Sequence, residues 1–385
     1  MITRRKLVNL VFKIYTMSLD LPKTSQFGTG QVHSDLNAKL RPYQRDGVRF
    51  LWDRVGRDAG GILCDDMGLG KTVQVIALLS ALYEKTGTSE DKRLITKMKL
   101  EDRRVEPSLV ICPGSVLCNW EVELDTWGHF YHLRYHRQER DATLTQARDG
   151  RVEVVLTTFD TVREYSESLA SVSWKVVIAD ECHKIKEISS GVTRALKSLP
   201  VRARVGLTGT ALQNKYEELW CLLDWANPGC LGSLDHFRAE FSQPMVRGFR
   251  QDASREELAV ARRQQAKFNA LKKAWLIRRT KKSVIADQLP KKTDQIMFCG
   301  LSAFQREVFK YLLSHPDVQR ILASFDPCSC GKKIPAHRCC RKEMSNDKDS
   351  KLQTIVLQFM QIFLKVANHA ALILPDSTSS SMQVR

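Results

Sequence analysis

Residues 61–72 read GILCDDMGLGKT and contain an apolar run, a glycine-rich loop and the start of a helix. The apolar run predicts a strand, and the segment 72–85 repeats apolar residues at helical spacing. In such a unit the loop N–H groups and the positive end of the helix cradle a triphosphate. Lys71 would supply a cation to the outer phosphates, and the Thr72 hydroxyl would bind magnesium. The loop residues that we expect to hold the nucleotide are Asp66, Met67, Gly68, Leu69, Gly70, Lys71 and Thr72.

The match to a general phosphate-binding loop is imperfect, because the usual pattern has glycine where Asp65 stands. Two glycines that open a helix also occur in turns that bind no ligand, so this interpretation stays open beside the first. The strand–loop–helix context favours the nucleotide.

A second strand ends in two acids, since residues 176–181 read VVIADE. Where a phosphate-binding loop is present, a carboxylate at such a strand end holds magnesium, directly or through water. A neighbouring carboxylate then orients and deprotonates the attacking water. We assign the first role to Asp180 and the second to Glu181, which with Lys71 make up the predicted catalytic set. A strand ending in Asp-Glu is mostly structural when it stands alone.

Other short apolar runs alternate with helical segments along the chain. They predict strands at 109–112, 152–157 and 204–207, and therefore an α/β fold with a parallel sheet and helices on both faces. The polar segment 86–107 is expected to be a surface loop, and residues 294–299 a last strand. Two further helices are expected over 302–313 and 351–374.

These patterns divide the chain into five segments. We expect a flexible basic extension over 1–36, a nucleotide-binding lobe over 37–232, a helical insertion with the last strand over 233–300, a helical linker with a cysteine cluster over 301–374, and a disordered tail over 375–385. The first residues are basic and free of acid up to Asp20. They suit a mitochondrial presequence or an ordinary basic lead-in, and we favour the second.

The composition points to a polyanion as partner. There are 60 Lys and Arg against 43 Asp and Glu, a formal net charge of +17. Basic surfaces bind nucleic acid through phosphate contacts, although a solvated basic surface without a partner is the alternative. No apolar run reaches the roughly 18–20 residues that cross a membrane, so no membrane partner is expected.

Most of the eleven cysteines stand alone in apolar runs, as in proteins of a reducing compartment. The exception is a cluster of four, with His337 among them. Zinc takes four such ligands, but the spacing is tighter than that of common zinc sites. A redox disulfide or no special role are the alternatives to zinc. The cluster consists of Cys328, Cys330, Cys339 and Cys340.

Several motifs resemble those of the superfamily-two helicase-like ATPases: DDMGLGKT at 65–72, DECH at 180–183 and GLTGTALQN at 206–214. The segments LRPYQR at 40–45, CPGS at 112–115 with NW at 119–120, and LIRRTK at 276–281 resemble the Swi/Snf-like DNA translocases, in which aspartate at the position of Asp65 is normal. ELDTWG at 123–128 and LWCLLDW at 219–225 resemble the Cockayne-syndrome-B-like excision-repair branch. The resemblance spans residues 40–371.

The resemblance implies a RecA-like lobe that binds ATP and magnesium in a DNA-dependent ATPase. Gln44 corresponds to the glutamine that reads adenine. Two departures from the family pattern are Cys182, where alanine is usual, and Arg137, where glycine is usual. The motif that couples phosphate state to lobe movement corresponds to Thr208, Gly209, Thr210 and Gln213. Segments that lie along DNA correspond to Pro113, Ser115, Trp120, Thr157, Thr158, Arg278, Arg279 and Lys281.

The resemblance also implies a second lobe, whose arginines stabilise the transferring phosphate. Residues 365–369 resemble the start of that lobe, and no Gln-x-x-Gly-Arg pattern follows. We therefore expect the first lobe of a translocase acting on double-stranded DNA or chromatin, in repair or remodelling, in the nucleus and with repair proteins as partners. The chain alone would be near-inactive. The alternatives are a non-catalytic ATP- and DNA-binding or partner-binding fragment and, less favoured, an RNA helicase.

Overall fold

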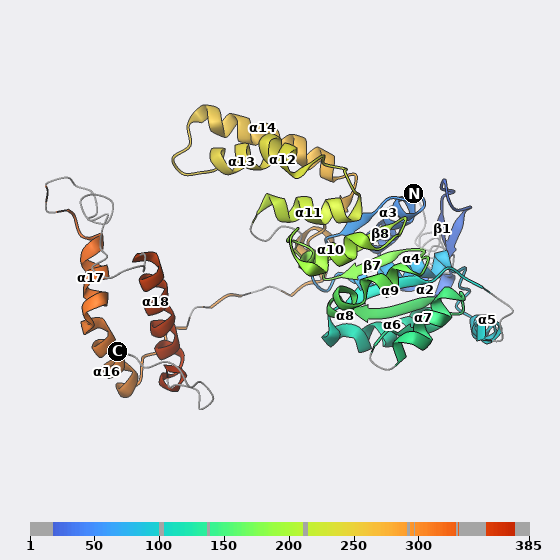
Figure 1. Cartoon of the computed structure of the whole chain (residues 1–385), viewed down its shortest axis with the longest axis horizontal. Coiled ribbons are helices and arrows are strands. Elements are labelled where there is room, and N and C mark those ends of the chain that lie inside the picture. Colours follow the sequence, from blue (N-terminus) through green and yellow to red (C-terminus); the bar gives the residue numbers. More distant parts are fainter. Residues whose placement is uncertain are drawn as a thin grey trace, which may run out of the picture. The chain divides into compact units, whose positions relative to one another are not determined.

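The computed structural model describes residues 18–99, 104–136, 139–210, 215–290, 293–295, 297–328, 330 and 352–373. The chain divides into two compact units, Met1–Leu289 and Pro290–Arg385. The first unit contains the sheet and the predicted nucleotide loop, and the second is helical where it is described (Figure 1).

Seven parallel strands form the sheet of the first unit, in the order β5-β6-β4-β7-β8-β3-β9. This confirms the predicted α/β fold with a parallel sheet. The strands are β3 (Gly61–Leu63), β4 (Ser108–Cys112), β5 (His132–Arg134), β6 (Val154–Thr158), β7 (Val177–Asp180), β8 (Arg204–Leu207) and β9 (Leu276–Ile277).

Helices cover both faces of this sheet. Successive residues of β4 alternate between two core clusters, with Leu109 and Ile111 in one and Val110 and Cys112 in the other. A strand with both faces buried is apolar at every position, which explains why continuous apolar runs marked these strands in the sequence. The helices around the sheet are α2 (Ser34–Lys39), α3 (Pro42–Val55), α4 (Lys71–Leu82), α5 (Ser89–Lys99), α6 (Leu117–Gly128), α7 (Arg140–Arg148), α8 (Phe159–Glu164), α9 (Ser166–Ala170), α10 (Gly191–Ser198) and α11 (Tyr216–Ala226), with short η1 (Gly114–Val116) and η3 (Cys182–Lys184).

A helical arm is inserted between α11 and the last strand, as expected. Its helices α13 and α14 lie side by side (Figure 1). Ser254 starts α14 by accepting from the N–H of Glu257, whose carboxylate accepts from the N–H of Ser254 in return. The arm and the segment after it comprise α12 (Leu234–Phe237), η4 (Arg238–Ser242), α13 (Gln243–Gly248), α14 (Arg255–Lys272), β9, α15 (Lys281–Val284) and η5 (Ala286–Gln288).

After the arm the chain returns to the sheet beside the nucleotide loop. β9 pairs in parallel with β3, with Leu276 opposite Ile62 and Ile277 opposite Leu63. The ladder continues past both strands, where the N–H of Asp66 donates to the carbonyl of Arg279 at 3.0 Å. The residues that follow the arm therefore lie against the loop that follows β3.

Three expectations about local structure are corrected. Residues 18–36 are no flexible extension: β1 (Leu19–Leu21) pairs with β2 (Gly30–Val32), and their apolar side chains join the core. The expected loop over 86–107 contains α5. The described part of 294–299 carries no strand, and β9 is the edge strand instead. Two-residue β9 was missed because its sequence carries charges immediately after it.

The second unit contains α16 (Ala303–Ser314), α17 (Pro316–Phe325), α18 (Leu352–Asn368) and η7 (Ala370–Ile373). Phe309 and Phe363 pack in a tilted arrangement with ring centroids 4.7 Å apart, and the Gln305 amide donates to the carbonyl of Val366 at 2.8 Å. α16 and α18 were expected, whereas α17 was not. In the described part of the chain, no helix combines the length and apolar character needed to cross a membrane.

Candidate ATP and magnesium site

The predicted site residues converge because β3, β7 and β8 are parallel and end at one edge of the sheet. The loop 65–70 leaves β3 and enters α4 at Lys71. Gly70 adopts a left-handed φ of +75°, and a Cβ there would lie 2.4 Å from Nε2 of Gln44. Glycine is therefore required at this position for two reasons, its conformation and its close neighbour.

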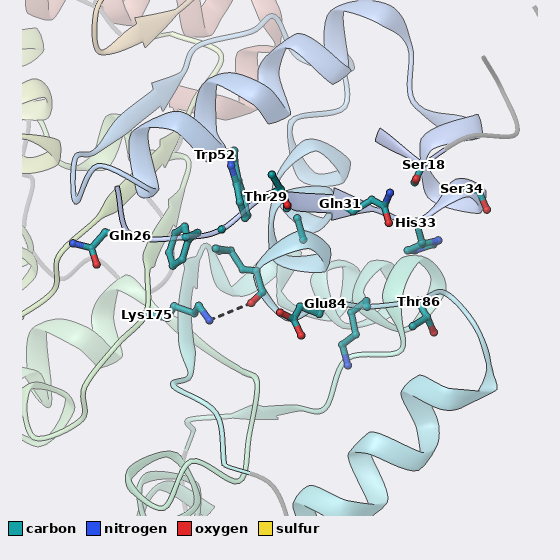
Figure 2. A pocket seen from close by; sticks show the side chains of 16 residues that line it. Ser18, Gln26, Thr29, Gln31, His33, Ser34, Trp52, Glu84, Thr86 and Lys175 are labelled. Atoms are coloured by element: carbon teal, nitrogen blue, oxygen red, sulfur yellow. Dashed lines mark hydrogen bonds between the residues drawn. The ribbon is translucent and has the colours of Figure 1, made fainter. Parts of the chain in front are cut away.

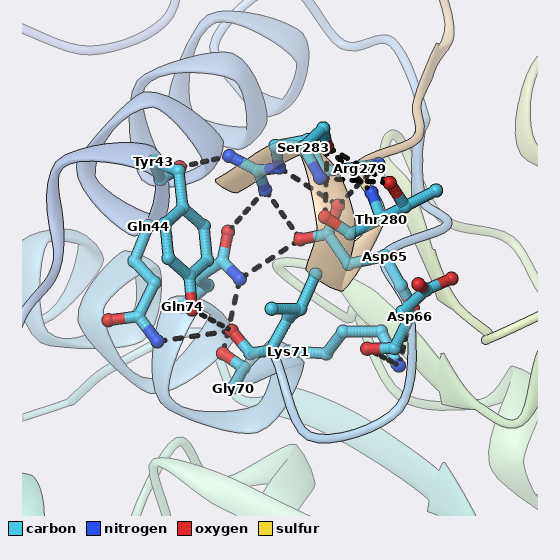
Figure 3. Close-up of polar contacts among 11 residues, drawn as sticks. Tyr43, Gln44, Asp65, Asp66, Gly70, Lys71, Gln74, Arg279, Thr280 and Ser283 are labelled. Atoms are coloured by element: carbon cyan, nitrogen blue, oxygen red, sulfur yellow. Dashed lines mark hydrogen bonds and ion pairs between the residues drawn. The ribbon is translucent and has the colours of Figure 1, made fainter. Parts of the chain in front are cut away.

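Lys71 lies along the inside of the loop, directed toward Asp66 (Figure 3). Its ammonium donates to the carbonyls of Asp65 at 2.8 Å and Asp66 at 3.4 Å. Thr72 is the next residue of α4 and is half-buried. The loop thus presents a cation, a hydroxyl and a helix N-terminus together, which is the chemistry that binds phosphate and magnesium.

Gln44 supports the loop from α3. Its Nε2 donates to the carbonyl of Leu69 at 3.1 Å, and its Oε1 accepts from the N–H of Arg41 at 2.8 Å. The hydroxyl of Tyr43 donates to the same Leu69 carbonyl at 3.2 Å. Tyr43 lines a cavity of about 290 Å³, to which the segment after the arm contributes Ile285 and Gln288.

Asp65 forms a buried ion pair with Arg279 (Figure 3). The guanidinium donates through Nε and Nη2 to the two carboxylate oxygens at 2.9 and 2.6 Å. Nη2 also donates to Oε1 of Gln74 at 2.8 Å, and Nη1 donates to the carbonyl of Tyr43. Asp65 has no exposed surface. Gln74, which also binds Arg279, packs closely against Gly47 of α3, where a Cβ would lie only 1.8 Å from Oε1 of Gln74. The acid that interrupts the usual glycine pattern thus anchors the returning chain to the loop.

This pairing corrects the expectation that Arg279 lies along DNA, because its guanidinium is engaged inside the lobe. Its neighbours differ. Arg278 is exposed, and the Nζ of Lys281 would lie 3.5 Å from a Cβ placed on Gly68, over the phosphate loop. The N–H of Lys281 donates to Oδ2 of Asp66 at 2.9 Å. The three basic residues of this motif therefore lie in different environments: Arg279 inside the lobe, Arg278 in solvent and Lys281 beside the phosphate loop.

Asp180 ends β7 with both carboxylate oxygens hydrogen-bonded. Nε1 of Trp120 donates to Oδ2 at 2.9 Å, and the N–H of Glu181 donates to Oδ1 at 2.9 Å. Burial raises the pKa of the Asp180 carboxyl above its ordinary value, while the Trp120 hydrogen bond and the charge of Lys71 act in the opposite direction. Oxygen donors from Asp180 and Thr72 fit magnesium, which prefers hard oxygen ligands and, when bound, neutralises the charge of the phosphates.

Glu181 has a left-handed backbone with φ of +52°, which is strained for a residue with a side chain. Its Oε2 lies 3.0 Å from Nδ1 of His183, and that nitrogen lies 3.4 Å from Oγ1 of Thr208. The Thr208 hydroxyl also accepts from the N–H of Thr210 at 3.1 Å. The predicted coupling motif thus contacts the predicted catalytic acid through His183, a residue to which the sequence assigned no role.

The coupling motif also borders the phosphate loop. A Cβ on Gly209 would lie 3.2 Å from Cγ of Met67 in the loop. Gln213 and Arg137 lie outside the described residues.

The residues predicted to lie along DNA divide into exposed and buried groups. Ser115 and Arg278 are exposed, and Pro113 and Thr158 are half-buried. Trp120 and Thr157 are each 1% exposed, so the expectation that they touch DNA is wrong. The hydroxyl of Thr157 donates to the carbonyl of Tyr135 at 3.3 Å.

Of the cysteine cluster, Cys328 and Cys330 are described, whereas His337, Cys339 and Cys340 lie outside the described residues. No group of three or more ligands that could hold a metal ion occurs among the residues that the structure describes. Because half of the cluster is not among them, the zinc hypothesis stays a prediction.

A larger cavity of about 900 Å³ lies away from these residues, between the β1–β2 hairpin and the end of α4 (Figure 2). Lys175 lines it and donates to the carbonyl of Leu82 at 3.1 Å. His33 lines it and lies with Nε2 3.3 Å from the carbonyl of Trp127. None of the predicted site residues lines this cavity.

The phosphate loop, the strand-end acids and the seven-stranded parallel sheet define a helicase-like ATPase lobe. The family model of the SNF2-related domain matches residues 43–370, and the chain belongs to this family.

Three curated proteins are similar to the chain. It is 40% identical to mouse DNA excision repair protein ERCC-6-like 2 over 90% of its length and 23% of that protein. It is 34% identical to Switch 2 of Arabidopsis thaliana over 90% of its length and 41% of that protein. It is 32% identical to human DNA excision repair protein ERCC-6 over 77% of its length and 20% of that protein. The chain therefore spans less than half of each relative.

Among solved structures, the Sulfolobus solfataricus SWI2/SNF2 ATPase core in complex with dsDNA is similar with a TM-score of 0.50 and 27% identity. The match covers 87% of this chain and 59% of that one.

Proposed function

We propose that the chain is the ATP-binding lobe of a DNA-dependent ATPase that acts on double-stranded DNA in repair or chromatin remodelling. The observation that carries this proposal is the meeting of Lys71, Asp180 and Glu181 at one edge of the sheet. The names of the relatives, which include excision repair proteins and an ATPase core bound to dsDNA, support the DNA substrate. A nuclear location and repair-protein partners belong to the same proposal.

A second candidate is a fragment that binds ATP and DNA without turnover. This candidate is favoured because two cations near the loop already have partners within the lobe. Arg279 is paired with Asp65, and Lys71 donates to the loop carbonyl of Asp65. The two candidates share their binding steps and differ in hydrolysis.

Replacing Lys71 with alanine is expected to weaken binding of a fluorescent ATP analogue by about 10–100-fold, because charge-assisted hydrogen bonds contribute about 1.5–3 kcal/mol. The matched control is Lys92→Ala, which removes an exposed lysine of α5 outside the loop and should bind as the wild type does. Fluorescence titration measures both, and circular dichroism checks that both remain folded. Equal affinities for the two variants would contradict a nucleotide site at this loop.

Binding of a short DNA duplex is expected to need no ATP and to fall by about a hundredfold between about 50 and about 200 mM salt, because phosphate contacts release counterions. Arg278→Ala should weaken binding for any DNA sequence and reduce the log–log salt slope by about one. Arg57→Ala is the control, since this exposed arginine is already paired with Asp53. Fluorescence anisotropy measures the slopes. An affinity indifferent to salt would mean that the basic surface is only solvated.

A further inference from the structure

Trp120 lies on the buried face of α6, although its sequence motif is one that lines DNA. The residues Leu117, Trp120 and Leu124 recur at helical spacing and are buried, so the ring packs into the core. Its one polar atom, Nε1, donates to Oδ2 of Asp180 at 2.9 Å. A hydrogen bond to an ionised carboxylate is stronger and more directional than one to a neutral acceptor, particularly away from water.

This hydrogen bond completes the restraint on the carboxylate. Oδ1 of Asp180 is held by the N–H of Glu181, so a donor on each oxygen fixes the plane of the group. Asp180 ends the interior strand β7, whereas Trp120 comes from α6, which packs against α4 and β6. The orientation of the predicted magnesium ligand therefore depends on where α6 lies.

The first turn of α6 is part of the surface. β4 and β7 are parallel neighbours, with Ile111 opposite Ala179, so the chain leaves β4 at the same edge as Asp180. It then forms η1 and enters α6 directly. Ser115, Cys118 and Asn119 are exposed on this segment, while Trp120 is 1% exposed. One short helical segment thus joins solvent to the carboxylate.

We propose that Trp120 is a positioning residue that orients Asp180 for magnesium and transmits to it the binding of duplex DNA along residues 113–119. The inference rests on the proposed function for its DNA step. A helix moves as a stiff body over so short a length, so a displacement of its first turn reaches the indole. A hydrogen bond weakens steeply when its distance or angle changes.

The first test measures magnesium-dependent nucleotide binding. Trp120→Phe removes the donor, and β-(3-benzothienyl)alanine at position 120 removes it while keeping the ring shape. The control is Trp127→Phe, because the Trp127 indole donates to Glu123 on the same helix and not to the site. Titration with a fluorescent ADP analogue, with magnesium or with EDTA, gives the gain in affinity that magnesium provides.

Both changes at Trp120 should reduce that gain by about tenfold, the magnitude of one charge-assisted hydrogen bond, without changing the affinity in EDTA. Trp127→Phe should leave both affinities unchanged. Loss of folding would reduce binding in EDTA as well, so a merely structural role is separated from positioning. If Trp120→Phe destabilises the chain, the benzothienyl variant decides the result. A magnesium gain equal to that of the wild type would overturn the inference.

The second test follows the indole itself. In protein labelled with 5-fluorotryptophan, the Trp120 fluorine resonance is assigned by its loss in Trp120→Phe. Addition of a DNA duplex without nucleotide should shift it, while the resonance of Trp174, which lies outside α6 and donates to the carbonyl of Leu169, stays. A Trp120 resonance that does not shift when DNA binds would overturn the proposal that DNA binding is transmitted to Asp180. A wild-type chain that binds no DNA would instead contradict the proposed function, and the magnesium comparison would still judge the positioning role.

Discussion

The 385-residue chain, assayed alone with ATP, magnesium and duplex DNA, is expected to hydrolyse ATP about 10³–10⁵-fold more slowly than a two-lobed relative. This corresponds to about 4–7 kcal/mol in the activation barrier. In the proposed function, Lys71, Asp180 and Glu181 position the phosphates, the metal and the water. Charge that develops on the transferred phosphoryl group needs further preorganised cations.

Besides Lys71, the described cations beside the loop include Arg279 and Lys281. Arg279 is paired with Asp65, and breaking this pair would leave a buried charge. Lys281 lies beside Gly68 of the loop. The solved SWI2/SNF2 ATPase core is matched over 59% of its length, so the rest of that protein lies outside the match. Fusing the remainder of such a relative to this chain should restore DNA-dependent turnover.

In the fused protein Glu181→Gln should remove turnover while leaving ATP binding intact, because only the carboxylate accepts the proton of the attacking water. Glu187→Gln, which changes an exposed carboxylate a few residues later, is the matched control and should be as active as the unmodified fusion. A coupled phosphate-release assay measures all of them. Fast hydrolysis by the unfused chain that Glu181→Gln abolishes would contradict the expectation and exclude the non-catalytic candidate.

Arg279→Ala is expected to lower the free energy of unfolding of the first unit by about 3–5 kcal/mol. The reason is that Asp65 has no exposed surface and would be left charged without its partner. The loss also removes the donors to Gln74 and Tyr43, so the support of the phosphate loop would weaken with it. Chemical denaturation followed by tryptophan fluorescence measures the change.

The matched control is Arg49→Ala. Arg49 and Asp46 form an ion pair of 3.0 Å on α3, but their side chains are 48% and 69% exposed. Such a pair contributes only about 0–1 kcal/mol, since water replaces the partner. Arg279→Lys keeps the charge and loses the planar fork, so it should fall between the wild type and Arg279→Ala. Equal stabilities of the Arg279→Ala and Arg49→Ala variants would contradict the structural role of the buried pair.

The sequence predicted the positions of the candidate site residues where these residues are close together along the chain. Lys71 and Thr72 follow β3 after one short loop, Asp180 ends the strand β7, and Glu181 is the next residue. The strands themselves could be read from their composition, because a strand covered on both faces must be apolar throughout. Parallel pairing then brings the ends of these strands to one edge, so the site follows from the topology.

Residues that act across the fold were assigned less well. Trp120 and Arg279 were expected to lie along DNA, yet both are directed inward. Each meets an acid far away in sequence, 60 positions for Trp120 and 214 for Arg279. The one signal for Arg279 was Asp65 itself, since an acid in place of a loop glycine, once buried, needs a cation. For Trp120 the sequence carried no comparable signal.

The sequence by itself therefore determined the fold class, the phosphate loop and the two strand-end acids, since each depends on a continuous local pattern. Only the tertiary structure decided that residues 18–36 join the core, that β9 closes the sheet beside β3, and which motif side chains are available to DNA. A motif fixes the path of the backbone, but whether a side chain lies in solvent or in the core depends on the surface packed against it. That surface comes from distant segments, here the helical arm and the edge of the sheet, which meet only when the chain folds.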